Sequence, residues 1–88
     1  MKVINHKEFA YFDYESVEST KYSLGDILFR YPDILSDEKP EIGIVIQIHS
    51  ELEFRTDMWG NSCDSDLIKP ATIKQIERFR PDLLNRLI

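Results

Sequence analysis

The stretch EIGIVIQIHSELEFRTDMWGN, residues 41–61, contains the pattern that decides the fold. In its first half, isoleucine recurs at every second position. A period of two sets alternate side chains on opposite faces of a β-strand, whereas a helix would scatter the isoleucines around its circumference. We therefore expect a strand with one apolar face, formed by Ile42, Ile44, Ile46 and Ile48.

The glycine of this strand and the residues after it indicate how the chain turns. Gly43 predicts a bend, a bulge or a close approach to the backbone, because it has no side chain. Residues 50–51 predict a tight reversal, and the alternating residues 52–59 predict a second strand. The Gly-Asn pair at 60–61 predicts the next reversal, since both residues tolerate positive φ.

Upstream and downstream segments extend this meander at both ends. A Gly-Asp pair at 25–26 is a turn signal, and the apolar and aromatic residues 27–31 predict a strand that Pro32 ends. Residues 32–40 carry a proline at each end and several charges, so they predict an exposed loop. A short closing strand is expected after the second reversal, ending at Pro70.

The tail changes from the period of a strand to that of a helix. Thr72 is a good N-cap for a helix that begins with IKQIERF, and Arg80-Pro81 interrupts it. The final PDLLNRLI predicts a last helical turn or two. We expect three parts: an N-terminal arm over 1–22 packed on the domain, a β-domain over 23–70 and a helical segment over 71–88.

The residues that carry a family resemblance are Gly25-Asp26 before the first strand and Gly43-Ile44-Val45 within the next one. With the long loop, hairpin and closing strand, residues 23–70 resemble an SH3-like small β-barrel of the KOW or Tudor type. The resemblance implies a mainly β (α+β) fold, an antiparallel small barrel of four to five short strands with a C-terminal helix. It also implies an aromatic groove for peptides.

Length and composition bound the class of protein. The 88 residues form one domain, and an apolar content of 42% is enough for one compact core. The single cysteine excludes an internal disulfide, which favours a reducing compartment. The first residues lack an apolar run long enough for a signal peptide or a membrane span. We therefore expect a cytoplasmic protein that does not enter membranes.

The charge of the chain disfavours general binding to nucleic acid. The net charge is −5, from 16 acidic and 11 basic residues. Binding to phosphate backbones requires clustered cations, and the basic residues cluster only near the C-terminus. We expect a protein partner, with nucleic acid the less favoured one.

The sequence does not present a catalytic or metal-binding pattern. Residues 57–66 are rich in acids, but their order does not follow that of a calcium loop. One cysteine and two histidines cannot fill a tetrahedral zinc site, and a Cys–His pair would also need an orienting group and a cleft. We therefore expect a non-enzymatic protein without cofactor or metal, in which Cys63 is a buried or partly buried structural thiol.

Aromatic side chains provide the stronger functional indication. They exceed what a small barrel can hide, and Trp59 is predicted on the strand face opposite Phe54. Tryptophan, tyrosine and arginine dominate the strongest contacts of protein interfaces. The alternative is that Trp59 covers one end of the barrel or packs against the C-terminal helix. The predicted partner-binding residues are Trp59, Arg55, Tyr31, Asp57 and Phe79.

These observations predict a non-enzymatic protein–protein interaction module. Its make-up, a short acidic domain with an appended helix, resembles that of many bacteriophage and mobile-element proteins, which suggests an accessory or regulatory role. One alternative is a KOW-like module that binds nucleic acid or a transcription complex. Another is an acidic mimic of nucleic acid that inhibits a host enzyme. The apolar stripe of the C-terminal helix is also a candidate surface for a homodimer.

Overall fold

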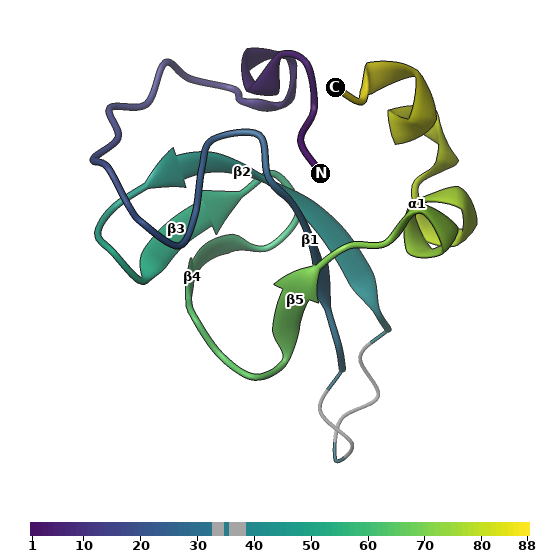
Figure 1. The fold of residues 1–88 in the computed structure, drawn as a ribbon. Coiled ribbons are helices and arrows are strands. Elements are labelled where there is room, and N and C mark those ends of the chain that lie inside the picture. Colours follow the sequence, from purple (N-terminus) through teal and green to yellow (C-terminus); the bar gives the residue numbers. More distant parts are fainter. Residues whose placement is uncertain (33–34, 36–38) are drawn as a thin grey trace.

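The structure is a computed structural model that describes residues 1–32, 35 and 39–88. The predicted loop over 32–40 lies largely outside the described residues. Strands form the middle of the chain and short helices lie towards both ends (Figure 1). The elements are the 3₁₀ helix η1 (His6–Phe9), β1 (Ile27–Arg30), β2 (Glu41–Ile48), β3 (Glu53–Thr56), β4 (Gly60–Cys63), β5 (Ile68–Pro70), α1 (Ile73–Phe79) and the 3₁₀ helix η2 (Pro81–Arg86).

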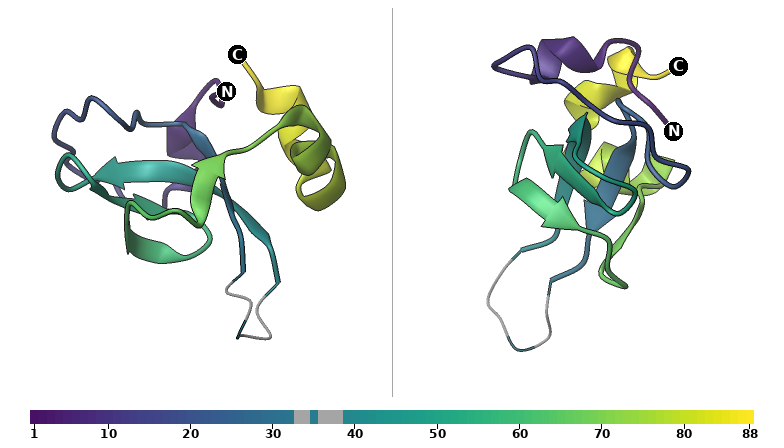
Figure 2. Two further views of the ribbon diagram at one scale, coloured as in Figure 1. Left: turned by 60° about the horizontal axis from the view of Figure 1, so that its bottom comes forward. Right: turned by 90° about the vertical axis from the view of Figure 1, so that its left-hand side faces the viewer.

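Within the described residues, the strands form one antiparallel sheet of five strands in the order β4-β3-β2-β1-β5. The last strand returns to pair with the first, so that Phe29 of β1 lies opposite Lys69 of β5. The sheet curls into a half-barrel (Figures 1 and 2). This arrangement confirms the prediction of a small, mainly β, antiparallel fold with a C-terminal helix.

A bulge in β2 changes which isoleucines share a face. Val45 pairs with Thr56, and the next pair is Gln47 with Arg55, so β2 contains one extra residue between the two pairs. An extra residue reverses the alternation of side chains. The first three isoleucines of the strand pack on one face, whereas Ile48 joins Val45 on the other. The prediction that all four isoleucines share a face is therefore wrong for Ile48.

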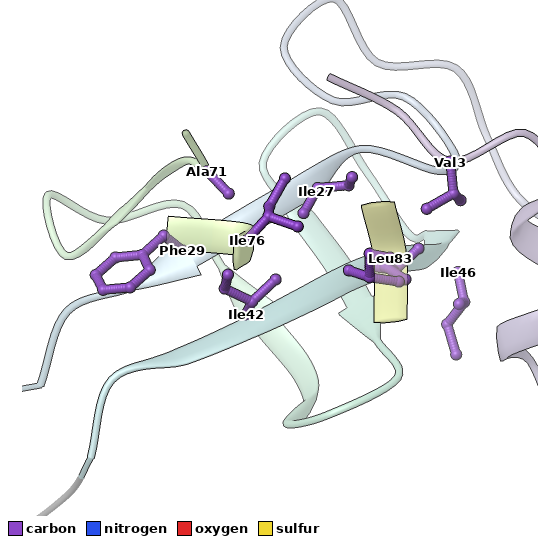
Figure 3. Packing of buried hydrophobic residues seen from close by; sticks show 9 residues of the cluster. Val3, Ile27, Phe29, Ile42, Ile46, Ala71, Ile76 and Leu83 are labelled. Atoms are coloured by element: carbon purple, nitrogen blue, oxygen red, sulfur yellow. The ribbon is translucent and has the colours of Figure 1, made fainter. Parts of the chain in front are cut away.

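Each face of the sheet contributes to a separate hydrophobic core. The face covered by α1, η2 and the N-terminal segment forms the helix-side core (Figure 3). The face turned away from these helices forms the opposite-side core. The helix-side core consists of Val3, Ile27, Phe29, Ile42, Ile44, Ile46, Ala71, Ile76 and Leu83. The opposite-side core consists of Tyr22, Leu28, Val45, Ile48, Phe54 and Ile68.

The C-terminal helix begins where the sequence predicts. The hydroxyl of Thr72 accepts the backbone N–H of Gln75 at 3.2 Å, and the Gln75 side chain accepts the Thr72 N–H at 2.9 Å, which completes a capping box. Ile76 of α1 and Leu83 of η2 are fully buried in the helix-side core, whereas Ile73 of the predicted stripe is exposed. No helix in the described part of the chain is long and apolar enough to cross a bilayer.

The second hairpin turns earlier than the sequence predicts. β3 ends at Thr56, and the chain reverses over residues 57–59. The Thr56 hydroxyl accepts the backbone N–H of Trp59 at 3.1 Å, which stabilises the turn. Gly60 has the expected positive φ, +67°, but it begins β4, and Asn61 lies inside that strand. The predicted reversal at Gly60-Asn61 is therefore misplaced.

Both ends of the chain pack together against the start of β1. The N–H of Val3 donates to the carbonyl of Gly25 at 3.0 Å, and the N–H of Ile4 donates to that of Arg86 at 2.6 Å. The first residues thus lie between the β-domain and η2 (Figure 1). This pairing holds the C-terminal segment over the helix-side core.

Candidate functional site

The two most exposed aromatic side chains among the described residues are neighbours in the sequence. Tyr11 is 89% exposed and Phe12 is 72% exposed. Together with Asp13 they form the arm tip, the name used below for residues 11–13. Aromatic rings are ordinarily buried because they carry a large apolar surface. Two adjacent exposed rings therefore make this segment a candidate contact surface.

The chain before the arm tip is anchored on the helix-side core. Phe9, at the end of η1, and Ala10 pack against that core, although both are only partly buried. The guanidinium of Arg80 lies 5.7 Å from the centre of the Phe9 ring. A cation over an aromatic face adds a favourable electrostatic contact. These contacts fix the position at which the arm tip begins.

The chain after the arm tip is anchored by hydrogen bonds to β2. The Gln47 side chain donates to the carbonyl of Glu15 at 3.0 Å. The Ser16 hydroxyl accepts the N–H of Ile48 at 3.1 Å, and the N–H of Val17 donates to the Ile48 carbonyl at 3.0 Å. The arm tip is therefore a short exposed loop that is held at both ends.

Hollows lie on both sides of the arm tip. One has a volume of about 300 Å³ and is lined by Tyr11 and by Met58 of the β3–β4 turn. The other has a volume of about 290 Å³ and is lined by Phe12, Tyr14 and Leu24. Each exposed ring thus borders a concave surface that could receive an apolar side chain.

Arg55, predicted as a partner-binding residue, lies beside the arm. Its guanidinium is 5.1 Å from the centre of the Tyr14 ring, and its Nε donates to the Gln47 side chain at 3.3 Å. Tyr14 in turn packs edge-on against Phe12, with ring centres 5.9 Å apart. Arg55 therefore supports the arm tip from the sheet side through Tyr14.

Asp57, a second predicted binding residue, lines the hollow between Tyr11 and Met58 and also makes structural contacts. Its carboxylate accepts the N–H of Ile44 at 2.8 Å and forms an ion pair with Arg80 at 2.8 Å. Only 9% of the Asp57 side chain and 16% of the Arg80 side chain are exposed. The pair joins the β3–β4 turn to the end of α1.

Tyr31 and Phe79, also predicted to bind a partner, gather around Phe29 away from the arm. The ring centres of Tyr31 and Phe79 lie 4.6 Å and 5.6 Å from that of Phe29. Both outer rings are partly exposed, and Ile73 of α1 is exposed on the same helix as Phe79. The homodimer predicted through the C-terminal helix would use this surface, because Ile76 and Leu83 are taken up by the core.

Trp59 lies on the same face of the sheet as Phe54 and is partly buried against the opposite-side core, so the prediction that it faces away from Phe54 is wrong. The chain turns before Trp59, which therefore does not continue the alternation of β3. Its ring covers Gly43, where an added Cβ would come within 2.5 Å of the indole. The guanidinium of Arg30 lies 5.2 Å from the ring centre. The indole Nε1 is buried and meets no hydrogen-bond partner within the described residues. The absence of a side chain at Gly43 thus allows the ring of Trp59 to approach the backbone of β2.

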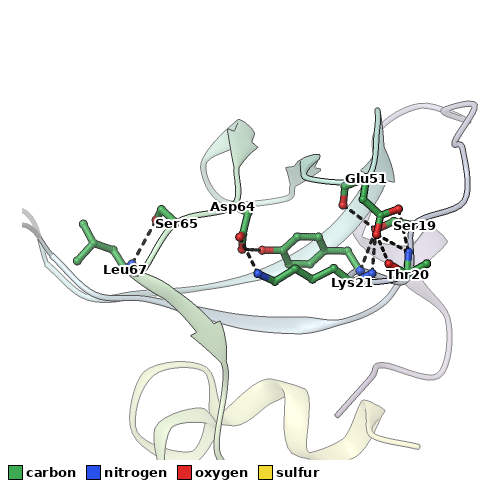
Figure 4. A network of polar contacts seen from close by, with 8 residues as sticks. Ser19, Thr20, Lys21, Glu51, Asp64, Ser65 and Leu67 are labelled. Atoms are coloured by element: carbon green, nitrogen blue, oxygen red, sulfur yellow. Dashed lines mark hydrogen bonds and ion pairs between the residues drawn. The ribbon is translucent and has the colours of Figure 1, made fainter.

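A group of polar side chains holds the loop after β4 against the end of the N-terminal arm (Figure 4). Lys21 donates to the Asp64 carboxylate at 2.6 Å, and the Tyr22 hydroxyl donates to the same carboxylate. The hydroxyl and N–H of Thr20 donate to the Glu51 carboxylate. A pocket of about 330 Å³ lies beside Tyr22 and Asp64. Two of the charged residues that line it, Lys21 and Asp64, are already paired with each other, so it is the weaker candidate for a binding site.

Replacing Tyr22 by phenylalanine tests this polar group. Burial and the hydrogen bond to Asp64 raise the pKa of the Tyr22 phenol. The hydrogen bond from Lys21, followed by that from Tyr22, lowers the pKa of Asp64. Removing one hydrogen bond should cost about 1 kcal/mol near neutral pH. A phenol with a raised pKa in the folded state stabilises the fold below the pKa of the unfolded state, and this contribution is lost as pH rises. We therefore expect the wild-type advantage over Tyr22→Phe, measured by thermal unfolding, to shrink above about pH 10. An advantage that grows above that pH would contradict this assignment.

The groups considered for metal binding or catalysis lie apart. No group of three or more His, Cys, Asp or Glu side chains in the described part of the chain could hold a metal ion. Cys63 is exposed at the end of β4, so the prediction of a buried or partly buried thiol is wrong. The His49 ring contacts the Asn61 side chain at 2.8 Å. The absence of an enzymatic activity and of a cofactor stays a prediction.

Fold and site together define a small antiparallel β protein with an anchored aromatic arm. Comparison with protein-family models, with curated proteins and with solved structures found no match for this chain. The five predicted partner-binding residues lie in three places: Arg55 and Asp57 near the arm, Tyr31 and Phe79 around Phe29, and Trp59 on the opposite-side core.

The arm tip itself is absent from the residues that the sequence singled out. Phe9 and Phe12 fit helical spacing loosely, and residues 11–14 could equally be extended, so the pattern did not determine which of these side chains face a core. The available signal was the number of aromatic side chains, which exceeds what a small barrel can hide. Met58 could not have been found in this way, because its exposure depends on where the hairpin turns.

Proposed function

We propose that the protein is a non-enzymatic protein–protein interaction module that binds its partner through the arm tip. The observation that carries this proposal is the near-complete exposure of Tyr11 and Phe12 on a loop anchored at both ends. Tyrosine and other aromatic residues contribute much of the binding energy at interfaces. A loop that is already held in place loses little conformational entropy on binding. The arm tip combines both properties.

We further propose that the domain belongs to the SH3-like class of small barrels. The strand order supports this, since a short last strand closes back on the first. The Gly-Asp pair at 25–26 precedes β1, and the Gly43 strand forms the centre of the sheet. Fold alone does not determine function, so the binding role depends on the arm tip and not on this likeness.

Charge pairing within the chain supports a protein partner over the two alternatives. Arg80 and Arg86, from the basic C-terminal group, face Asp57 and Glu8 in ion pairs. This leaves fewer free cations for phosphate contacts. Several acids are likewise engaged inside the chain, among them Asp57 and Asp64. A nucleic-acid mimic would instead require a continuous negative face.

The proposal is tested by replacing both tip aromatics with serine. The Tyr11→Ser, Phe12→Ser variant should lose capture of a partner from extracts of the source cells, measured by affinity purification and mass spectrometry. Its free energy of unfolding should stay within about 0.5 kcal/mol of the wild type, because both rings are exposed. The matched control is Tyr11→Phe, Phe12→Tyr, which keeps the aromatic surface and should keep the partner. Equal capture by the serine variant would contradict the proposal.

A further inference from the structure

β4 lies at one end of the sheet and pairs only with β3 among the described strands. Figure 2 shows it at the rim of the half-barrel. Strands at the edge of a sheet present backbone groups that have no partner on one side. The other edge strand, β5, ends in Pro70, which has no N–H to donate. The two edges of this sheet therefore differ in their capacity to pair.

The hydrogen-bond pattern identifies which groups of β4 face outward. Asp64, directly after β4, donates its N–H to the carbonyl of Leu52 at 2.8 Å, so it faces β3. The register between the two strands is regular, and inward and outward residues alternate in an antiparallel ladder. Ser62 therefore faces β3, whereas the N–H and C=O groups of Asn61 and Cys63 face away from it.

Apart from its short length, the outward edge of β4 lacks, within the described residues, the features that usually prevent pairing. Such features are a very short strand, proline, lysine, a bulge or a covering segment. The four residues of β4 are Gly, Asn, Ser and Cys, and their pairing with β3 is free of bulges. The side chains of Asn61 and Cys63 are small and exposed. An approaching strand would thus meet two donors and two acceptors without steric obstruction by a large side chain.

We propose that an extended segment of a partner protein adds to β4 as a further antiparallel strand, and that this segment carries basic side chains. The proposal rests on the protein-binding role proposed above and adds a second contact surface to it. The outward N–H and C=O groups of Asn61 and Cys63 would pair with the backbone of the incoming strand.

The charges near the Cys63 end of β4 indicate a basic occupant. Glu53 lies opposite Cys63, and Glu51, whose carboxylate accepts from Thr20, lies one residue before Leu52, the partner of Asp64. Asp66 follows in the next loop and, like both glutamates, is exposed. The cations nearby are Arg55, which lies opposite Asn61, and Lys21, which is already paired with Asp64. Lysine or arginine on an added strand would find opposite charge here, and opposite charges on neighbouring strands are favourable.

A second copy of the chain is the less favoured occupant. A stable dimer usually buries at least about 1,000 Å². Pairing along an edge of four residues would bury a much smaller area. Two copies would also bring their acidic groups together. A short linear segment of a larger partner requires only the edge itself, because main-chain hydrogen bonds supply much of its affinity.

The test uses a synthetic eight-residue peptide of alternating lysine and valine, blocked at both ends, added to the full-length protein. Amide hydrogen exchange is followed by NMR. Saturating peptide should slow exchange at Asn61 and Cys63 by at least about tenfold, with little change at Ser62. A peptide with glutamate in place of lysine should bind at least about tenfold more weakly. Unchanged exchange at Asn61 and Cys63 would overturn the proposal.

Variants at one position separate the backbone contact from the side chain. Cys63→Pro removes an outward donor that β3 does not use, and it should weaken peptide binding by about tenfold. Cys63→Ser keeps the N–H and should bind like the wild type. Equal binding by a folded Cys63→Pro variant would overturn the proposal. So would exchange that slows with protein concentration in the absence of peptide, because the occupant would then be a second copy.

The arm-tip variant distinguishes this inference from the proposed function. Tyr11→Ser, Phe12→Ser should bind the lysine–valine peptide as the wild type does, because the anchors of the arm tip lie on the helix-side core and on β2. Loss of peptide binding in that variant would contradict a separate site on β4. Loss of the cellular partner with intact peptide binding would support the roles of both surfaces.

Discussion

Replacing Arg80 by methionine is expected to lower the free energy of unfolding by about 3–5 kcal/mol. Arg80 and Asp57 form a largely buried ion pair, and methionine would keep much of the aliphatic volume while removing the charge. The Asp57 carboxylate would then be left buried, with the N–H of Ile44 as its remaining hydrogen-bond donor among the described residues. An uncompensated buried charge costs far more than the intact pair contributes.

The loss should extend beyond the pair itself, because the pair connects distant parts of the chain. Asp57 belongs to the β3–β4 turn, and Arg80 stands between α1 and η2. The Arg80 guanidinium also lies over the Phe9 ring. Hydrogen exchange at residues 9–17 should therefore rise in the variant, since the anchor before the arm tip is weakened.

The matched control is Arg78→Met, which lies two residues earlier, in the last turn of α1. Arg78 is exposed, and its guanidinium lies 5.4 Å from the centre of the Phe79 ring. Its replacement should change the free energy of unfolding by no more than about 0.5 kcal/mol. Equal losses for Arg78→Met and Arg80→Met in urea unfolding would show that general charge, and not the ion pair, is responsible.

Replacing Gly43 by alanine is expected to destabilise the fold by about 1–3 kcal/mol and to expel the Trp59 ring. The added Cβ would lie 2.5 Å from the indole and 2.9 Å from the Thr56 hydroxyl, which caps the turn. The ring is the more easily displaced, since it is at the end of a side chain. Trp59 is the only tryptophan, so a red shift of its fluorescence would report the displacement directly.

A double-mutant cycle isolates this contact from other effects of alanine at position 43. In a Trp59→Leu background the ring is absent, so Gly43→Ala should cost much less than in the wild type. The same cost in both backgrounds would mean that the glycine is required by the backbone and not by Trp59. In that case the prediction that Trp59 covers Gly43 in solution would be wrong.

Local patterns in the sequence were sufficient to predict much of the fold. The isoleucine repeat predicted β2, and Thr72 predicted the start of α1, because both signals arise from neighbours in the chain. Gly43 predicted a bend, a bulge or a close approach, and the structure shows a close approach by Trp59. The strand and the cap depend on residues within one element, so they are visible without tertiary information, whereas the identity of the residue that approaches Gly43 is not.

Features set by contacts between elements could not be predicted in the same way. The bulge that moves Ile48 to the other face depends on pairing with β3. The early turn depends on the Thr56 hydroxyl and on the ion pair of Asp57 with Arg80, which lies far along the chain. The exposure of Tyr11 depends on anchors at both ends of the arm tip. Aromatic content indicated a binding surface, but only the packing of the arm located one.

Site-specific photo-crosslinking at position 12 tests the proposed binding role most directly. A photoreactive phenylalanine analogue in place of Phe12 keeps an aromatic ring at the arm tip, and the same analogue at Glu77, exposed on α1, serves as the control. In the source cells, position 12 should form a crosslink to one protein partner, and position 77 should form none to it. A crosslink to that partner from position 77 but not from position 12, or crosslinks at position 12 to nucleic acid alone, would contradict the proposed role of the arm tip.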